Sequence, residues 1–195
     1  MRPFLAVVVA YLVGAVPVGF LVARAFGLGD IRRHGSGTIG ATNVLRTMGK
    51  GAAVLTLIGD VAKGALAVWL GRLVSVDAAP AAAVAAVVGN CWPVFLRFRG
   101  GKGVATGFGA LLALVPLAVA PAAIVWIAIT AGFRYVSLGS VLAALCVPLG
   151  AAMLAYPWPS VLASVVVAAI ILLRHRENIG RLLAGTERRL GERTA

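Results

Sequence analysis

Long apolar runs, separated by short polar segments, constrain this chain more than any other feature of its sequence. The runs lie at 3–25, 51–71, 78–96, 104–131, 138–155 and 159–173. Hydrophobic residues make up 61% of the chain and charged residues only 12%, which leaves too few polar groups to cover a soluble domain. Runs of this length are typical of helices that cross a lipid bilayer. Since 3–23 lacks charge and exceeds the apolar core of a signal peptide, we predict a transmembrane helix there.

Proline and charge determine the predicted number of spans. The fourth run is too long for one straight span, and Pro116 and Pro121 predict two short helices, at 103–115 and 117–130. With seven spans and the N-terminus outside, nearly all Lys and Arg residues face the cytoplasm, as the positive-inside rule requires. Five spans would need one helix through Pro157 and Pro159, which oppose it.

We therefore predict an all-α integral membrane protein with a single polytopic domain over 1–195. It has seven transmembrane helices, some of them short or broken, and a cytoplasmic C-terminus. The net charge of +12 would suggest nucleic-acid binding in a soluble protein, but basic flanks of membrane spans explain it here, and we predict no nucleic-acid partner. Cys91 and Cys146 lie in apolar runs, and no Cys/His or acidic cluster suggests a metal site, so we expect neither a metal nor another cofactor.

The first informative polar segment is 33–46, RHGSGTIGATNVLR. Its glycines form G-x-G-x-x-G, but no strand precedes them, which excludes a dinucleotide fingerprint. The segment also places hydroxyl, amide and guanidinium groups beside flexible backbone. These groups belong to Ser36, Thr38, Thr42, Asn43 and Arg46. This composition is typical of an anion-binding site, and the alternative is a flexible cytoplasmic loop.

An ionisable pair interrupts the second apolar run. Asp60 and Lys63 are three residues apart and therefore share a helix face. Two interpretations remain open: the charges neutralise each other so that the helix can insert, or they line a polar cavity that binds substrate.

The segment RFRGGKGVATGFG at 97–109 combines cations with unusual glycine density. It is not a Walker A motif, because Gly103 stands where that motif needs Ser or Thr. Backbone at Gly100, Gly101 and Gly103 can nevertheless surround a phosphate, with Lys102 as a point charge at the start of a helix. A plain positive-inside loop is the alternative, but it requires no glycine.

Two further polar segments are predicted on the cytoplasmic side. Arg134, Ser137 and Ser140 open one helix, where Ser137 could simply be an N-cap. His175 and Asn178 follow the last run and share a helix face, although a single His at a membrane boundary is more often an interfacial residue. One or two phosphate-bearing ligands explain these separate polar segments together.

At these residues the chain resembles the bacterial acyl-phosphate:glycerol-3-phosphate acyltransferases of the PlsY type. The similar stretches are GSGTIGATNVLRTMGK, GDVAKG, FRGGKGVAT, RYVSLGS and HRENIGRLLAGTE, in the family's order. The resemblance implies a seven-helix enzyme of the inner (plasma) membrane with its active site open to the cytoplasm. It implies acyl transfer from acyl phosphate to the 1-hydroxyl of glycerol 3-phosphate, which gives lysophosphatidic acid for phospholipid synthesis. Membrane lipid is the other expected partner, and the sequence does not indicate a protein partner.

The chain departs from the family pattern at two positions. Thr38 replaces the usual Asn of the first segment, and Asn90 replaces a His before the glycine-rich loop. An Asn side chain cannot serve as a general base near neutral pH, so proton transfer at position 90 is doubtful.

Residues and resemblance together predict the site. The predicted catalytic residues are Ser36, Arg46, His175 and Asn178. The predicted substrate-binding residues are Thr42, Asn43, Asp60, Lys63, Gly100, Gly101, Lys102, Gly103, Arg134, Ser137 and Ser140. His175 is the best candidate for the base that accepts the alcohol proton, but the phosphate of the donor could accept it instead.

Two other function classes compete with the acyltransferase. An organic-phosphate transporter would also need cations within the membrane, but its polar residues would lie near the midplane of related halves, and the sequence has no internal repeat. A lipid phosphotransferase typically needs acidic metal ligands, and Asp60 is the one acidic residue deep in a predicted span.

Overall fold

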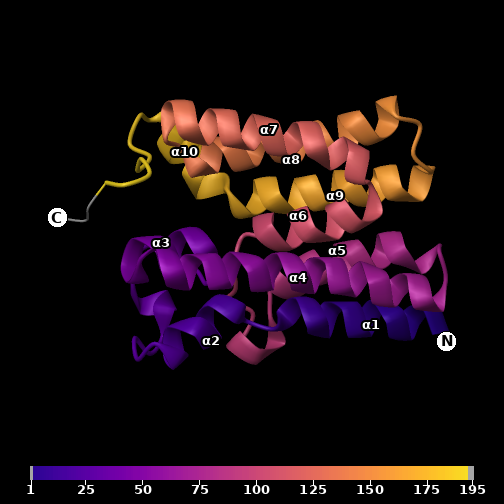
Figure 1. The fold of residues 1–195 in the computed structure, drawn as a ribbon, viewed down its shortest axis with the longest axis horizontal. Helices are drawn as coiled ribbons and strands as arrows, with labels where there is room; N and C mark the ends of the chain where they lie inside the picture. The colour runs from indigo at the N-terminus through magenta and orange to yellow at the C-terminus, as the bar shows by residue number, and fades with distance from the viewer. Residues whose placement is uncertain (1, 193–195) are drawn as a thin grey trace. The chain divides into compact units, whose positions relative to one another are not determined.

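The computed structural model describes residues 2–192, which form helices and connecting loops without a strand (Figure 1). The chain divides into two compact units, Met1–Leu114 and Val115–Ala195. The first unit contains the helices α1 Arg2–Ala15, α2 Val18–Ala25, η1 Ile31–Arg33, α3 Ala41–Met48, α4 Lys50–Val74, α5 Ala78–Cys91, η2 Val94–Leu96 and α6 Val104–Leu114. The second contains α7 Pro116–Phe133, α8 Val136–Met153, α9 Trp158–Arg174 and α10 Arg176–Leu183.

Small residues bring the helices of the first unit close together. Helix α4 packs against α1, α5 and α6, and α1 packs against α5 (Figure 1). A Cβ atom on Gly64 of α4 would collide with the Thr106 carbonyl of α6, and one on Gly109 of α6 would collide with the Val61 carbonyl of α4. Only glycine permits this approach, which places the polar turn of α4 directly beside the start of α6.

The first apolar run forms a candidate membrane span over Arg2–Ala25, as predicted, but the span is broken into two helices. Helix α1 ends at Ala15, and Pro17 stands at the N-cap of α2. Proline has no N–H to continue the helical hydrogen bonds, which explains the break. The break leaves the Val16 carbonyl accessible to a side chain from α4.

The predicted division of the fourth run is confirmed at Pro116. Helix α6 ends at Leu114 and α7 begins at Pro116, where a missing N–H costs nothing in the first turn. Pro121, which we expected to contribute to the break, instead lies inside α7.

In the second unit, α8 packs against both α7 and α9, and α10 contacts α8 and α9. A bend of 61° separates α9 from α10. His175 lies at this bend, as the C-cap of α9 and the N-cap of α10.

Within the described residues, 5 helical segments are long and apolar enough to cross a membrane, or up to 6 if α9 and α10 form one bent span. Helix α6 is apolar but shorter than these segments. Large apolar side chains are exposed on the helices of both units, including Phe4, Trp69, Leu149 and Met153. Such exposure is expected where lipid rather than water surrounds a helix.

Candidate active site

The first polar segment is an ordered loop around Asn43, a residue of α3 that is 1% exposed. The Asn43 Oδ1 atom accepts a hydrogen bond from the backbone N–H of Ser36 at 2.8 Å. Its Nδ2 atom donates to the carbonyls of Thr38 at 2.8 Å, His34 at 3.1 Å and Ile31 at 3.4 Å. These contacts close 31–43 into a defined loop, unlike the flexible loop that was the alternative. They favour a positioning role for Asn43 over the predicted contact with substrate.

Hydroxyl groups line the surface of this loop. Ser36 is exposed, and its Oγ lies 3.2 Å from Thr38 Oγ1. Thr42 and Arg46, both half-buried, are one turn apart on α3. Gly35 adopts a φ of 60°, and a Cβ there would collide with Asn43 Oδ1, so the turn requires glycine. The side chains of Ser36 and Thr38 are therefore presented at the surface by an ordered backbone.

A buried ion pair occupies the polar turn of α4. Lys63 Nζ lies 2.8 Å from Asp60 Oδ1, and the two side chains are only 6% and 5% exposed. The ammonium group also donates to Asn90 Oδ1 at 2.9 Å and to the Val16 carbonyl at 2.8 Å. The shared face predicted for Asp60 and Lys63 is confirmed. With three partners inside the first unit, Lys63 fits charge neutralisation better than direct substrate binding.

Asn90 also contacts the glycine-rich loop. Its backbone carbonyl accepts a hydrogen bond from the N–H of Gly101 at 3.0 Å. Gly100 and Gly101 are buried, Lys102 is half-buried, and Gly103 has a φ of 83° just before α6 begins. The predicted start of a helix after this loop is confirmed. Because Asn90 binds both Lys63 and Gly101, it connects the buried ion pair to the loop.

We expect Gly100→Ala to destabilise the protein much more than Gly101→Ala. A Cβ on Gly100 would collide with the backbone carbonyl of Asn90, whereas one on Gly101 would meet the movable Asn90 Nδ2 at 2.9 Å. Overpacking of this kind costs about 1–3 kcal/mol, and the backbone collision belongs at the upper end. Thermal unfolding in detergent measures the difference. Gly51→Ala, which has open space around it, is the control, and an unfolding temperature for Gly100→Ala equal to that control would contradict the expectation.

The polar cluster of the second unit is built around Glu187, whose side chain is 5% exposed. Its Oε1 accepts hydrogen bonds from Ser137 Oγ at 2.8 Å and from Asn178 Nδ2 at 2.6 Å. Its Oε2 accepts one from Arg181 Nε at 2.7 Å. Burial raises the pKa of this carboxyl, but the hydrogen bonds from Asn178, Ser137 and Arg181 outweigh burial and bring the pKa below its ordinary value. The carboxylate therefore stays ionised near neutral pH and fixes both predicted site residues.

Sequence reasoning missed Glu187, although it lies at the end of the last similar stretch. Glu177, the acidic residue that lies nearer to His175 in the sequence, is exposed. Ser137 was considered as an N-cap, and that alternative is wrong, because the N-cap of α8 is Tyr135 and Ser137 binds Glu187 instead. The available signal was an acidic residue just after Gly185, where a helix would end.

His175 is buried at the bend between α9 and α10. It is 3% exposed, and its Nδ1 lies 2.8 Å from the Ile171 carbonyl. Because a carbonyl can only accept, this contact places the ring hydrogen on Nδ1, and in the neutral ring Nε2 is then the acceptor. Asn178 is also buried, which agrees with the predicted shared face. This tautomer is the one that a base acting through Nε2 requires.

Arg134 and Ser140 have partners inside the second unit. Arg134 Nε and Nη2 both donate to the Leu190 carbonyl, at 3.0 and 2.6 Å. Ser140 Oγ donates to the Val136 carbonyl at 2.8 Å and accepts from Trp126 Nε1 at 3.2 Å. The Arg134 contacts hold the segment after α10 against the start of α8, and the Ser140 contacts join α8 to α7. Both sets favour structural roles for these residues over the predicted contact with substrate.

The described residues contain no group of three or more His, Cys, Asp or Glu side chains suited to a metal ion. Cys91 and Cys146 do not form a disulfide bond.

Comparison with known proteins identifies the family. The family model described as glycerol-3-phosphate acyltransferase matches residues 4–185. The chain is 51% identical to the glycerol-3-phosphate acyltransferase of Desulforudis audaxviator, over 94% of this chain and 93% of the relative. It is 48% identical to that of Rubrobacter xylanophilus, over 100% of this chain and 98% of the relative.

Solved structures agree with the sequence relatives. The crystal structure of PlsY, an integral membrane glycerol 3-phosphate acyltransferase, in its glycerol 3-phosphate form has a TM-score of 0.93 and 37% identity to this chain. The match covers 98% of this chain and 96% of PlsY. The lysophosphatidic acid form of PlsY gives a TM-score of 0.91 at 36% identity. The chain therefore belongs to the glycerol-3-phosphate acyltransferase family, as an integral membrane protein of the PlsY type.

Proposed function

We propose that this protein transfers a fatty acyl group from acyl phosphate to the 1-hydroxyl of glycerol 3-phosphate. The products are lysophosphatidic acid and inorganic phosphate. The observation that supports this most strongly is the likeness, over 98% of the chain, to PlsY in a glycerol 3-phosphate form. Both proposed substrates carry phosphate, and the chain offers a hydroxyl-lined loop and a glycine-rich loop with Lys102 to bind such anions.

The proposed reaction needs a base but no strong acid. The 1-hydroxyl oxygen attacks the acyl carbonyl carbon, the bond from that carbon to the phosphate oxygen breaks, and phosphate leaves as a stable anion. The hydroxyl proton passes either to His175 Nε2 or to the phosphate of the donor. Backbone N–H groups of the glycine-rich loop, together with Arg46 and Lys102, supply positive charge for the phosphate or for the developing oxyanion.

The residues divide into those that contact substrate and those that position them. We propose direct contacts for Ser36, Thr42, Arg46 and Lys102, whereas Gly101, whose N–H donates to the Asn90 carbonyl, shapes the loop that carries Lys102. In the second unit, His175 acts at the reacting hydroxyl. Asn178 and Ser137 are the other proposed active-site residues of this unit, and the Glu187 carboxylate holds both of them in place.

We propose that the chain crosses the inner membrane of the cell seven times, with the N-terminus outside and the active site facing the cytoplasm. The support is the distribution of basic residues, which favours the cytoplasmic side for the segments that carry the proposed site. The short helix α6 counts as a span in this arrangement, and its close packing against α4 can compensate for its length.

The proposed function is tested by incubating the purified protein with palmitoyl phosphate and radiolabelled glycerol 3-phosphate. We expect labelled lysophosphatidic acid to form at the same rate with and without a metal chelator. Palmitoyl-CoA, the control donor, should give no product. Equal rates with palmitoyl-CoA would refute the donor assignment, and a rate that chelation abolishes and magnesium restores would refute the metal-free reaction. Uptake of glycerol 3-phosphate into proteoliposomes without any acyl transfer would instead indicate a transporter.

A further inference from the structure

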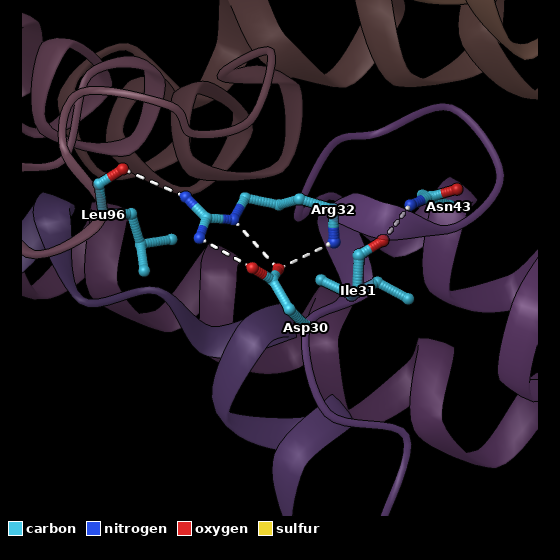
Figure 2. Close-up of polar contacts among 5 residues, drawn as sticks. All are labelled: Asp30, Ile31, Arg32, Asn43 and Leu96. Carbon is cyan, nitrogen blue, oxygen red and sulfur yellow. Dashed lines mark hydrogen bonds and ion pairs between the residues drawn. The ribbon is translucent and has the colours of Figure 1, made fainter.

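Arg32 connects the two polar loops of the first unit (Figure 2). Its Nε and Nη2 donate to Asp30 Oδ1 and Oδ2, at 2.9 and 2.8 Å. Its Nη1 donates to the carbonyl of Leu96, the last residue of η2, at 3.0 Å. One planar guanidinium thus binds its own loop by two hydrogen bonds and the segment before the glycine-rich loop by a third, a combination that suits Arg and not Lys.

The position of the guanidinium is closely defined by its surroundings. Asp30 caps η1 by accepting a hydrogen bond from the Arg32 N–H at 3.0 Å, so the carboxylate is fixed at the start of the helix (Figure 2). The hydrogen bond from the Arg32 side chain is the main cause that lowers the pKa of Asp30 to about 2, which keeps it ionised at any working pH. The Phe20 ring centroid lies 5.6 Å from the Arg32 guanidinium carbon, a cation–π contact.

The carbonyl that Arg32 holds begins a strained turn. Arg97 and Phe98 follow Leu96 with φ values of 54° and 61°, in the left-handed region that non-glycine residues rarely adopt. Each such residue costs roughly 1–2 kcal/mol and persists only where its surroundings impose it. The Leu96 carbonyl also accepts the N–H of Arg99 at 3.3 Å. The chain passes from this turn directly into Gly100 and Gly101.

The other side of η1 leads to the hydroxyl-lined loop. The Ile31 carbonyl accepts a hydrogen bond from Asn43 Nδ2 (Figure 2). The same side-chain amide also binds the Ser36 N–H and the Thr38 carbonyl. Arg32 therefore lies between the backbone that presents Ser36 and the turn that leads to Lys102. Positive-inside topology explains a cation at this position, but it does not explain three hydrogen bonds and a ring contact.

We propose that Arg32 is a positioning residue that sets the geometry of the glycine-rich loop against the loop of Ser36. This proposal rests on the proposed function, in which both loops bind phosphate. Without the third hydrogen bond, the turn at 96–98 relaxes toward ordinary φ values, and the backbone that follows it at 100–103 no longer holds Lys102 in a fixed position. Anion binding then weakens although no group that touches the substrate has changed.

The test compares Arg32→Gln and Arg32→Lys with Arg33→Gln, a neighbouring exposed arginine that loses the same charge. We expect Arg32→Gln to raise the apparent KM for a phosphate substrate about tenfold, with kcat within about threefold of wild type. Arg32→Lys should recover only part of this loss, because an ammonium group cannot reproduce the fork. A role in folding alone would lower the active fraction and apparent kcat but leave KM unchanged. Wild-type KM values for both substrates in Arg32→Gln would overturn the proposal.

Amide hydrogen exchange separates this proposal from the proposed function. The N–H groups of Arg97 and Phe98 donate to the carbonyls of Val94 and Pro93, at 3.3 and 3.0 Å, and report directly on the turn. We expect exchange over 97–103 to be several-fold faster in Arg32→Gln than in wild type and in Arg33→Gln. Unchanged exchange would overturn the positioning role whatever reaction the protein catalyses. A wild-type protein without acyl transfer would refute the proposed function alone, since the exchange comparison would still stand.

Discussion

Alanine at His175 is expected to lower kcat by roughly 10²–10⁴-fold, the usual loss when a positioned general base is removed. The ring is held at the bend between α9 and α10 by the Ile171 carbonyl, with Nδ1 as the donor. A neutral imidazole in this tautomer can accept a proton at Nε2, as a base that deprotonates the hydroxyl in the proposed reaction must do. Steady-state kcat, measured with palmitoyl phosphate on protein that elutes as a folded species in detergent, is the readout.

Two further variants distinguish a base from a merely buried ring. Asn178→Ala should also lose most activity, because Asn178 shares the buried face and contributes a short hydrogen bond to Glu187. Glu177→Ala, an exposed neighbour, is the matched control and should keep near wild-type turnover. If His175→Ala and Asn178→Ala also kept near wild-type turnover, the segment after α9 would be only an interfacial anchor. A loss in His175→Ala well below 10²-fold would favour the donor phosphate as the base.

Alanine at Lys63 is expected to destabilise the protein by about 3–5 kcal/mol, the cost of leaving one member of a buried ion pair without its partner. Asp60 would become an uncompensated buried carboxylate, and the Val16 carbonyl and Asn90 Oδ1 would each lose a donor. The change in thermal unfolding in detergent, with the yield of folded protein from membranes, measures the effect. An unfolding temperature equal to wild type would contradict it.

The double variant Asp60→Asn with Lys63→Met determines which of the two original interpretations is right. Removing both charges together avoids an unpaired buried ion, so much of the lost stability should return. If the pair only neutralises charge, the folded double variant keeps a near wild-type KM. If Lys63 also binds substrate phosphate, the KM rises by about tenfold or more although the protein is folded.

Local chemistry explains the predictions that succeeded. Pro116 lacks an N–H and therefore suits the first turn of a helix, and the boundary predicted at that residue was located correctly, whereas Pro121 lies inside α7. Long uncharged runs predicted helices long enough to cross a membrane, and the described helices confirm that such helices are present. The predicted number of seven spans is not confirmed. The five polar stretches, taken in order, predicted the family correctly, because together they specify far more than any one of them does.

Predictions about individual polar side chains could not be complete, because the same donor groups in a segment can bind either a ligand or other parts of the protein. Asn43 and Arg134 have donor groups suited to a phosphate, yet these groups bind backbone carbonyls in the structure. Glu187 was missed because its importance lies in its partners, Ser137 and Asn178, at separations of 50 and 9 residues along the chain. Sequence spacing within a single helix face reveals no such contact.

The sequence by itself determined that this is a helical membrane protein of a particular acyltransferase family. Hydrophobicity, proline chemistry and the order of the motifs are properties of the sequence itself, so they can be interpreted without knowledge of the fold. Only the tertiary structure decided which polar groups face one another: Lys63 toward the carbonyl freed at Val16, Arg32 toward Leu96, and Ser137 toward Glu187. The physical reason is that a buried donor must find an acceptor, and which acceptor lies within 3 Å depends on how distant segments pack together.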